Sequence, residues 1–151
     1  FIEDRPPVKM SYRAKVRRSL LGSGAIIDGS VEDSVIFSGV YVSRGAEIRQ
    51  SIVMSDTRIE EEAIVDRAIL DKNIIVGQKA RVGYGEDLRP NRVIPDMLRS
   101  GLTVVGRNAH IPPGAIVGRN CRIGTDVKKE DFSSLVLESG ESIEKPKEEW
   151  K

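Results

Sequence analysis

Aliphatic side chains recur at every sixth position between Thr103 and Val127. One set is Val105, Ile111, Val117 and Ile123, and a second set follows it by four residues at Ala109, Ala115, Cys121 and Val127. Six residues of an α-helix turn through about 600°, so these positions form no single stripe on a helix. Side chains of a strand alternate with a period of two, so both sets lie on one face of an extended chain. The spacing therefore predicts strands.

The extended chain must also turn at regular intervals. A single straight strand of this length would run about 80 Å, far beyond an ordinary strand. The residues three places after the first aliphatic set are Asn108, Gly114, Asn120 and Asp126. These residue types adopt a positive φ at the least cost. Each six-residue unit is therefore predicted to be a short strand followed by a bend.

The same rhythm forms an internal repeat earlier in the chain. Residues 34–50, 51–67 and 68–84 align as three blocks of seventeen residues, and 19–33 is a looser copy. The alignment predicts three aliphatic columns: Ile36, Val53 and Leu70; Val42, Ile59 and Val76; Ile48, Val65 and Val82. Three columns indicate an all-β, three-sided coil whose strands pair in parallel, with a rise of about 4.8 Å per coil. The core exists only in the stack, because a single coil buries nothing. This pattern resembles the hexapeptide-repeat, left-handed parallel β-helix. The left hand is implied by the resemblance, since parallel crossovers are usually right-handed.

The repeat defines the expected organisation of the chain. We expect residues 1–18 to be a linker, stiffened by Pro6 and Pro7. The β-helix should extend over 19–143, interrupted at 85–101 by a loop with a short helix of one or two turns that starts at Pro95. Residues 132–143 should add a last strand or two, and 144–151 should form a tail. Because the chain starts at Phe1 without an initiator methionine, we expect it to be part of a longer protein.

Composition and charge exclude several kinds of partner. The 151 residues are 39% hydrophobic and 31% charged, which is typical of one soluble domain. The sequence has no apolar run of membrane-spanning length and no secretory signal, so we expect no membrane partner and a cytoplasmic location. Six bases and no acids lie between Arg5 and Arg18. No aromatic stacking platform accompanies them, which argues against nucleic acid. A solvated linker, or a surface for phosphorylated small molecules or an acidic neighbouring domain, explains them better.

Few residues of the sequence are suited to catalysis. A zinc site with three histidines is excluded, because His110 is the only histidine. Hexapeptide acyltransferases commonly use one histidine as general base, so His110 defines an alternative function. It should point outward, and no carboxylate is placed to orient it. Cys121 is expected in the core and the glycines at corners, so we predict no catalytic residue and no metal ligand.

Three segments around the repeat resemble one family. They are PPVKM at 6–10, AILDKNIIVG at 68–77 and SGLTVVGRNAHIPPG at 100–114. Together with the repeat they resemble, over residues 6–127, the C-terminal domain of glucose-1-phosphate adenylyltransferase (ADP-glucose pyrophosphorylase) of the bacterial glycogen-synthesis type. The β-helix domain of another sugar-phosphate nucleotidyltransferase is a second alternative.

The resemblance implies a division of labour. The full enzyme transfers an adenylyl group from ATP, with Mg²⁺, to glucose 1-phosphate, and makes pyrophosphate and ADP-glucose for glycogen or starch. ATP and Mg²⁺ belong to the catalytic domain, so this chain should need no cofactor and be inactive alone. Its family role is assembly, as a tetramer of like or unlike subunits, and allosteric control. The implied partners are its own catalytic domain, other subunits and a phosphorylated small-molecule effector.

The resemblance also points to two effector-binding residues. The basic residue of the family's Asp-Lys or Asp-Arg motif corresponds to Lys72, and the basic residue after the family's SGxxxV-type strand corresponds to Arg107. Each is a cation beside a corner, where backbone N–H groups can also face an anion. Lys72 would supply a point charge, and Arg107 a fork that can hold two phosphate oxygens.

Overall fold

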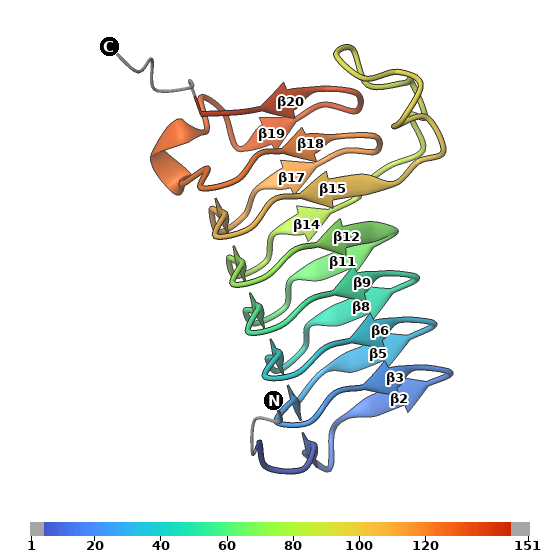
Figure 1. The fold of residues 1–151 in the computed structure, drawn as a ribbon, viewed down its shortest axis with the longest axis vertical. Coiled ribbons are helices and arrows are strands. Elements are labelled where there is room, and N and C mark those ends of the chain that lie inside the picture. The colour runs from blue at the N-terminus through green and yellow to red at the C-terminus, as the bar shows by residue number, and fades with distance from the viewer. Residues whose placement is uncertain (1–4, 146–151) are drawn as a thin grey trace.

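Regularly spaced aliphatic residues and bends produce a three-sided solenoid (Figure 1). The computed structural model describes residues 5–145, and the strands in that range are two or three residues long. The chain passes in turn through three parallel sheets, A, B and C. We name the bends after the sheets that they join: the A–B corner, the B–C corner and the C–A corner.

The three sheets follow the repeat of the chain. Sheet A contains β1 (Lys9–Met10), β4 (Ile26–Ile27), β7 (Tyr41–Val42), β10 (Arg58–Ile59), β13 (Ile75–Val76) and β16 (His110–Ile111). Sheet B contains β2 (Lys15–Arg17), β5 (Ser30–Glu32), β8 (Glu47–Arg49), β11 (Ile64–Asp66), β14 (Arg81–Val82), β17 (Ile116–Val117) and β19 (Val136–Leu137). Sheet C contains β3 (Leu20–Leu21), β6 (Val35–Ile36), β9 (Ile52–Val53), β12 (Ala68–Leu70), β15 (Thr103–Val105), β18 (Arg122–Ile123) and β20 (Ser142–Ile143).

The predicted aliphatic columns are confirmed. Val53 pairs in register with Ile36 on one side and Leu70 on the other, and the other two columns pair in the same way. All nine side chains are at most 2% exposed. Because most strands present only one aliphatic residue inward, the core is a narrow rod along the axis. Removing that apolar surface from water is the main force that holds the coils together.

The predicted bends are confirmed as well. The φ angles of Asn108, Gly114, Asn120 and Asp126 are 63°, 74°, 55° and 62°, all in the left-handed region. Bulkier residues also take this conformation, such as Glu62 and Lys79 at the A–B corner. The energy of stacking therefore holds these residues in a conformation that costs an isolated residue about 1 kcal/mol.

The solenoid begins earlier than we expected. Two strands, β1 and β2, lie inside the segment 1–18 that we interpreted as a linker, and they pair with β4 and β5. Val16 packs against the core, whereas its neighbours Lys15 and Arg17 are exposed. The basic residues therefore occupy outward positions of a strand, where charge is tolerated. Residues 1–4 lie outside the described range.

The insertion and the C-terminal end differ from the repeat in other ways. The short helix expected near Pro95 is a single turn, in which the N–H groups of Met97 and Leu98 donate to the Ile94 carbonyl. At the C-terminal end, β19 and β20 form as predicted, but a 3₁₀ helix, η1 (Lys129–Asp131), occupies the place of a further strand of sheet A. The expected tail falls mostly in residues 146–151, outside the described range. Within residues 5–145, no helix has the length and apolar character needed to cross a bilayer.

Candidate functional site

The C–A corner brings the two predicted effector residues together. Leu70 pairs in register with Val105, so Lys72 and Arg107, two residues further along each chain, occupy the same corner on adjacent coils. The Asn108 N–H donates to the Lys72 carbonyl over 3.1 Å, which joins the two bends directly. The two bends are 35 residues apart in the sequence. They are neighbours in space because the insertion between them lies outside the stack of coils. Consecutive coils lie about 4.8 Å apart, so the two cations can reach one phosphate group.

A ladder of side-chain amides holds this corner in place. Asn73 Nδ2 donates to Asn108 Oδ1 over 2.9 Å, and Asn108 Nδ2 donates to Asp126 Oδ1 over 3.1 Å. Each of the three residues has a positive φ, which turns its side chain along the solenoid axis toward the next coil. The ladder fixes the backbone on which Lys72 and Arg107 stand. It therefore reduces the conformational entropy that anion binding would otherwise cost.

The cationic side chains at the centre of this corner are unpaired. Both Lys72 and Arg107 are exposed, and no hydrogen bond or ion pair joins either side chain to another residue in the range 5–145. The nearest carboxylate in sequence, Asp71, accepts a hydrogen bond from the Lys72 N–H over 2.7 Å. Two exposed cations on a rigid corner can bind a phosphate or another multivalent anion.

Two further basic residues, Arg5 and Lys128, lie on the same corner. Arg5 binds Asp56, with Nη1 2.8 Å from Oδ1, and this hydrogen bond lowers the pKa of the Asp56 carboxyl. On the other side, Lys128 Nζ donates to the Asn108 carbonyl. The sequence placed Arg5 in the basic run of the predicted linker. Stacking brings both to the ends of the ladder, where Asp56 balances the charge of Arg5 and Lys128 adds one positive charge to the C–A corner.

His110 has the orientation that we expected but lacks the partners of a general base. It points outward from β16 and is half-buried. Burial lowers its pKa, and the charges of Lys128 and Lys129 lower it further. Within residues 5–145, no carboxylate is hydrogen-bonded to the imidazole to orient it. The geometry therefore does not favour the acyltransferase alternative.

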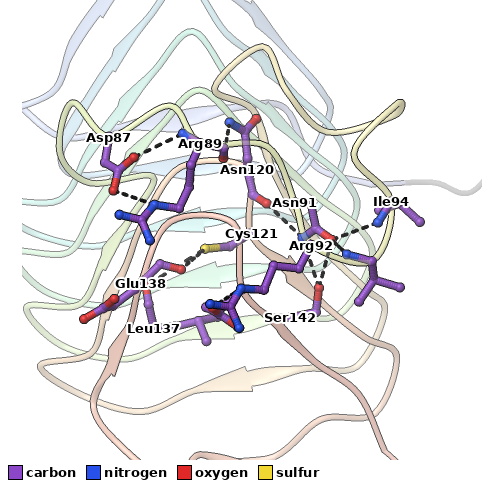
Figure 2. A network of polar contacts seen from close by, with 12 residues as sticks. Asp87, Arg89, Asn91, Arg92, Ile94, Asn120, Cys121, Leu137, Glu138 and Ser142 are labelled. Atoms are coloured by element: carbon purple, nitrogen blue, oxygen red, sulfur yellow. Dashed lines mark hydrogen bonds and ion pairs between the residues drawn. The ribbon is translucent and has the colours of Figure 1, made fainter.

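Other residues weighed for chemistry have structural positions. Cys121 is fully buried, and burial raises the pKa of its thiol to about 11. Its Sγ donates to the Glu138 carbonyl over 3.2 Å (Figure 2). Residues 5–145 contain no group of three His, Cys, Asp or Glu side chains that could hold a metal ion.

The insertion is fixed at a different edge of the solenoid, the B–C corner, by two buried asparagines (Figures 1 and 2). Asn120 Oδ1 accepts from the Gly101 N–H over 2.8 Å, and its Nδ2 donates to the carbonyls of Leu88 and Arg89. Asn91 Nδ2 donates to the Asn120 carbonyl over 2.9 Å and to Ser142 Oγ over 3.0 Å. The spacing showed Asn120 as a bend residue but gave no indication of these partners.

An ion pair closes the base of the insertion. Arg119 Nη2 lies 3.0 Å from Asp66 Oδ2, and Arg119 Nε donates to the Gly85 carbonyl over 2.9 Å. Only 11% of the Arg119 side chain is exposed, so removing Asp66 would leave a poorly solvated charge without its partner. The insertion is therefore held rigidly at its base, at Asn91 and at Gly101.

Fold and sequence together define the class of this protein. A family model for GlmU-like, C-terminal hexapeptide domains matches residues 6–105, and the chain belongs to this family of left-handed β-helices. Its particular relatives are glucose-1-phosphate adenylyltransferases, which confirms the resemblance seen in the sequence. The chain is 47% identical over 142 residues to the enzyme of Thermomicrobium roseum, covering 93% of this chain and 33% of that protein. Identity to the enzyme of Acetivibrio thermocellus is 42% over 141 residues, covering 91% and 33%.

The chain thus spans about a third of the length of these curated relatives. Among solved structures, WeeI from Acinetobacter baumannii superposes with a TM-score of 0.61 at 11% identity, covering 79% of this chain and 52% of that one. At this identity the likeness shows the fold alone.

Proposed function

We propose that this chain is the regulatory and assembly domain of a glucose-1-phosphate adenylyltransferase. The observation that supports this most directly is the 47% identity over 93% of the chain, confined to a third of the relative's length. In the proposed parent protein, the remaining part transfers an adenylyl group from ATP, with Mg²⁺, to glucose 1-phosphate. This domain contributes no catalytic residue. It joins the subunits of a cytoplasmic tetramer.

The proposed regulatory ligand is a phosphorylated small molecule bound at the C–A corner. The support is geometric, because Lys72 and Arg107 stand exposed and unpaired on adjacent coils within the described range. Arg107 would hold two phosphate oxygens and Lys72 would add a point charge. Sugar bisphosphates, 3-phosphoglycerate and inorganic phosphate share the chemistry that these two side chains recognise.

The effector site is tested in the full-length protein by Lys72→Ala and Arg107→Ala. A charge-assisted hydrogen bond contributes about 1.5–3 kcal/mol. Each substitution is therefore expected to raise the activator concentration for half-maximal response by roughly tenfold or more, because 1.4 kcal/mol corresponds to a factor of ten. Turnover without activator should stay nearly unchanged. The measurement is ADP-glucose formation against the concentration of each candidate effector.

A matched control is Lys79→Ala. Lys79 is exposed at the A–B corner of the same coil as Lys72, and its Nζ lies 3.9 Å from Glu62. Loss of this cation should leave activation as in the wild type. Unaltered activation in both Lys72→Ala and Arg107→Ala would remove these residues from the effector site.

The function itself is tested by the sequence of the parent protein. We expect the reading frame to extend upstream of Phe1 through a nucleotidyltransferase domain, and the full-length product to form ADP-glucose from ATP and glucose 1-phosphate. A reading frame that starts immediately before Phe1 would contradict the proposal.

A further inference from the structure

A second group of basic side chains lies on sheet B, where β14 leads into the insertion (Figure 1). Arg49, Arg81 and Arg119 line a concave site of about 280 Å³. Arg49 on β8 and Arg81 on β14 are two coils apart, and β11 between them contributes Ile64 and Asp66 to the lining. Sheet B is the side of the three-sided solenoid opposite the C–A corner. This site is therefore separate from the predicted effector residues.

Two of the three arginines have unpaired guanidinium groups. The side chains of Arg49 and Arg81 are exposed, and neither forms a hydrogen bond or ion pair with another residue in the range 5–145. Arg81 stacks on the Tyr84 ring, with Cζ 5.1 Å from the ring centroid. This contact positions the guanidinium without occupying its N–H groups. Both arginines can therefore offer paired donors to an oxyanion.

The carboxylates beside Arg49 already have partners. Arg49 lies in register with Glu32 and Asp66 on the neighbouring coils. Glu32 Oε1 is 2.9 Å from Arg18 Nη2, and Asp66 Oδ2 is 3.0 Å from Arg119 Nη2. Neither carboxylate neutralises Arg49, so its charge remains available to a ligand.

The site also presents N–H groups that lack acceptors. Only 11% of the Arg119 side chain is exposed. Three of its N–H groups donate to Gly85 and Asp66, and the other two of the five in a guanidinium have no acceptor among residues 5–145. The backbone N–H groups of Gly85 and Glu86 also donate to no residue of that range. Beyond its chain neighbours, a Cβ at Gly85 would meet no atom within 4 Å, so a ligand can approach the backbone here.

These donors and charges define the kind of ligand. The lining contains three arginines and two carboxylates, Asp66 and Glu86, which leaves an excess of one positive charge. Guanidinium groups and free backbone N–H groups together are typical of phosphate sites. Ile64 and the Tyr84 ring, which is 47% exposed, add apolar surface to a site that is larger than one phosphate group. A phosphate group joined to a small organic part uses both kinds of surface.

We propose that this site binds the phosphate ester of a small molecule, as a second anion site independent of the C–A corner. Arg49 and Arg81 hold the phosphate oxygens, and N–H groups of Arg119 and Gly85 complete the site. Because Arg119 also closes the base of the insertion, the bound anion stabilises the insertion in its closed position by mass action. The inference does not depend on the proposed function, since it uses only contacts within this chain.

The test is amide hydrogen exchange in the full-length protein, with inorganic phosphate as the probe and sodium chloride of equal ionic strength as the reference. In the wild type, phosphate should slow the exchange of Gly85 and Glu86 at least fivefold, because their N–H groups gain an acceptor. In Arg49→Gln/Arg81→Gln, the phosphate concentration for half-maximal protection should rise at least tenfold. Glu86→Gln should lower it about twofold, because this variant removes an exposed negative charge.

Two variants serve as controls. Arg58→Gln is matched to Arg81, because exposed Arg58 stacks on Tyr41 of sheet A, with Cζ 5.2 Å from the ring centroid. The second control is Lys72→Ala/Arg107→Ala, which removes both cations of the C–A corner. Both proteins should show the protection of the wild type. Phenyl phosphate should protect the wild type at a lower concentration than inorganic phosphate, since its ring can contact the apolar part of the site.

Several results would overturn the inference. Protection by phosphate no greater than by chloride refutes the site, and equal protection in Arg49→Gln/Arg81→Gln shows that the anion binds elsewhere. Loss of protection in Lys72→Ala/Arg107→Ala would assign the effect to the C–A corner. If phenyl phosphate is no better than inorganic phosphate, the ligand is not an ester. Glu86→Gln keeps the test decisive if urea unfolding shows the double arginine variant to be unstable, because its expected effect is tighter binding.

Discussion

The anchoring of the insertion can be tested at Asn120, whose side chain makes three hydrogen bonds to the insertion. In Asn120→Ala, the buried Gly101 N–H loses its acceptor, which costs about 1–3 kcal/mol. Loss of the bonds to the Leu88 and Arg89 carbonyls, at 3.2 and 3.1 Å, adds roughly 1 kcal/mol. Alanine at a φ of 55° adds about 1 kcal/mol of strain. The sum is about 3–5 kcal/mol.

The control for this substitution is Asn108→Ala. Asn108 has a similar φ of 63°, so the backbone strain is nearly the same in both variants. Its side chain, however, takes part in a half-exposed ladder, where water can replace the lost partners. We expect Asn120→Ala to be less stable than Asn108→Ala by about 2–3 kcal/mol.

Two measurements read out the effect. Equilibrium unfolding in urea gives the free energy of unfolding, and limited trypsin digestion reports opening of the insertion at Arg92 and Arg99. A difference of 2 kcal/mol corresponds to roughly a 30-fold larger open population, and so to a similarly faster cleavage within the insertion. If the two variants unfold at the same urea concentration and are cut at the same rate, the hydrogen bonds of Asn120 do not hold the insertion.

Two other predictions concern the core and the coil spacing. A Cβ at Gly77 would lie 2.5 Å from the Pro113 nitrogen and 2.8 Å from the Ile111 carbonyl oxygen of the next coil, so Gly77→Ala should destabilise the chain by about 1–3 kcal/mol in urea unfolding. In the control Gly124→Ala, the nearest atom to the new Cβ is in the flexible Glu144 side chain, at 3.3 Å, so the free energy of unfolding should fall by less than about 0.5 kcal/mol. Equal losses of stability in the two variants would contradict this reasoning. Burial raises the pKa of the folded Cys121 thiol to about 11, so the same thiol in the unfolded chain ionises at a lower pH. The free energy of unfolding should therefore fall between pH 9 and 11 in the wild type. Cys121→Ala should lose this part of the pH dependence, and an unchanged profile would refute the assignment.

Much of the fold followed from residue spacing, since a solenoid is nearly one-dimensional. Each inward residue pairs with its equivalent in the next coil, so the six-residue spacing is enough to predict both the core residues and the register of the strands. The column of Ile36, Val53 and Leu70 and the bend at Asn108 could therefore be predicted residue by residue.

The start of the solenoid could not be read in this way. Val16 is the single inward residue of β2, and the bases around it resemble a charged linker. Only pairing with β5 shows that Lys15 and Arg17 are outward positions of a strand. The path of the insertion was equally hidden, because Asn91 and Asn120 meet through contacts that no periodic pattern encodes.

The sequence by itself determined the three-sided coil, the residues of its core, the conformation of its corners and the family to which the chain belongs. Only the tertiary structure decided where the coils begin, how the insertion is anchored, and which cations share the C–A corner. The physical reason is that inward positions obey a local period, whereas surfaces are assembled from residues of several coils and of the insertion, whose distance in space depends on stacking.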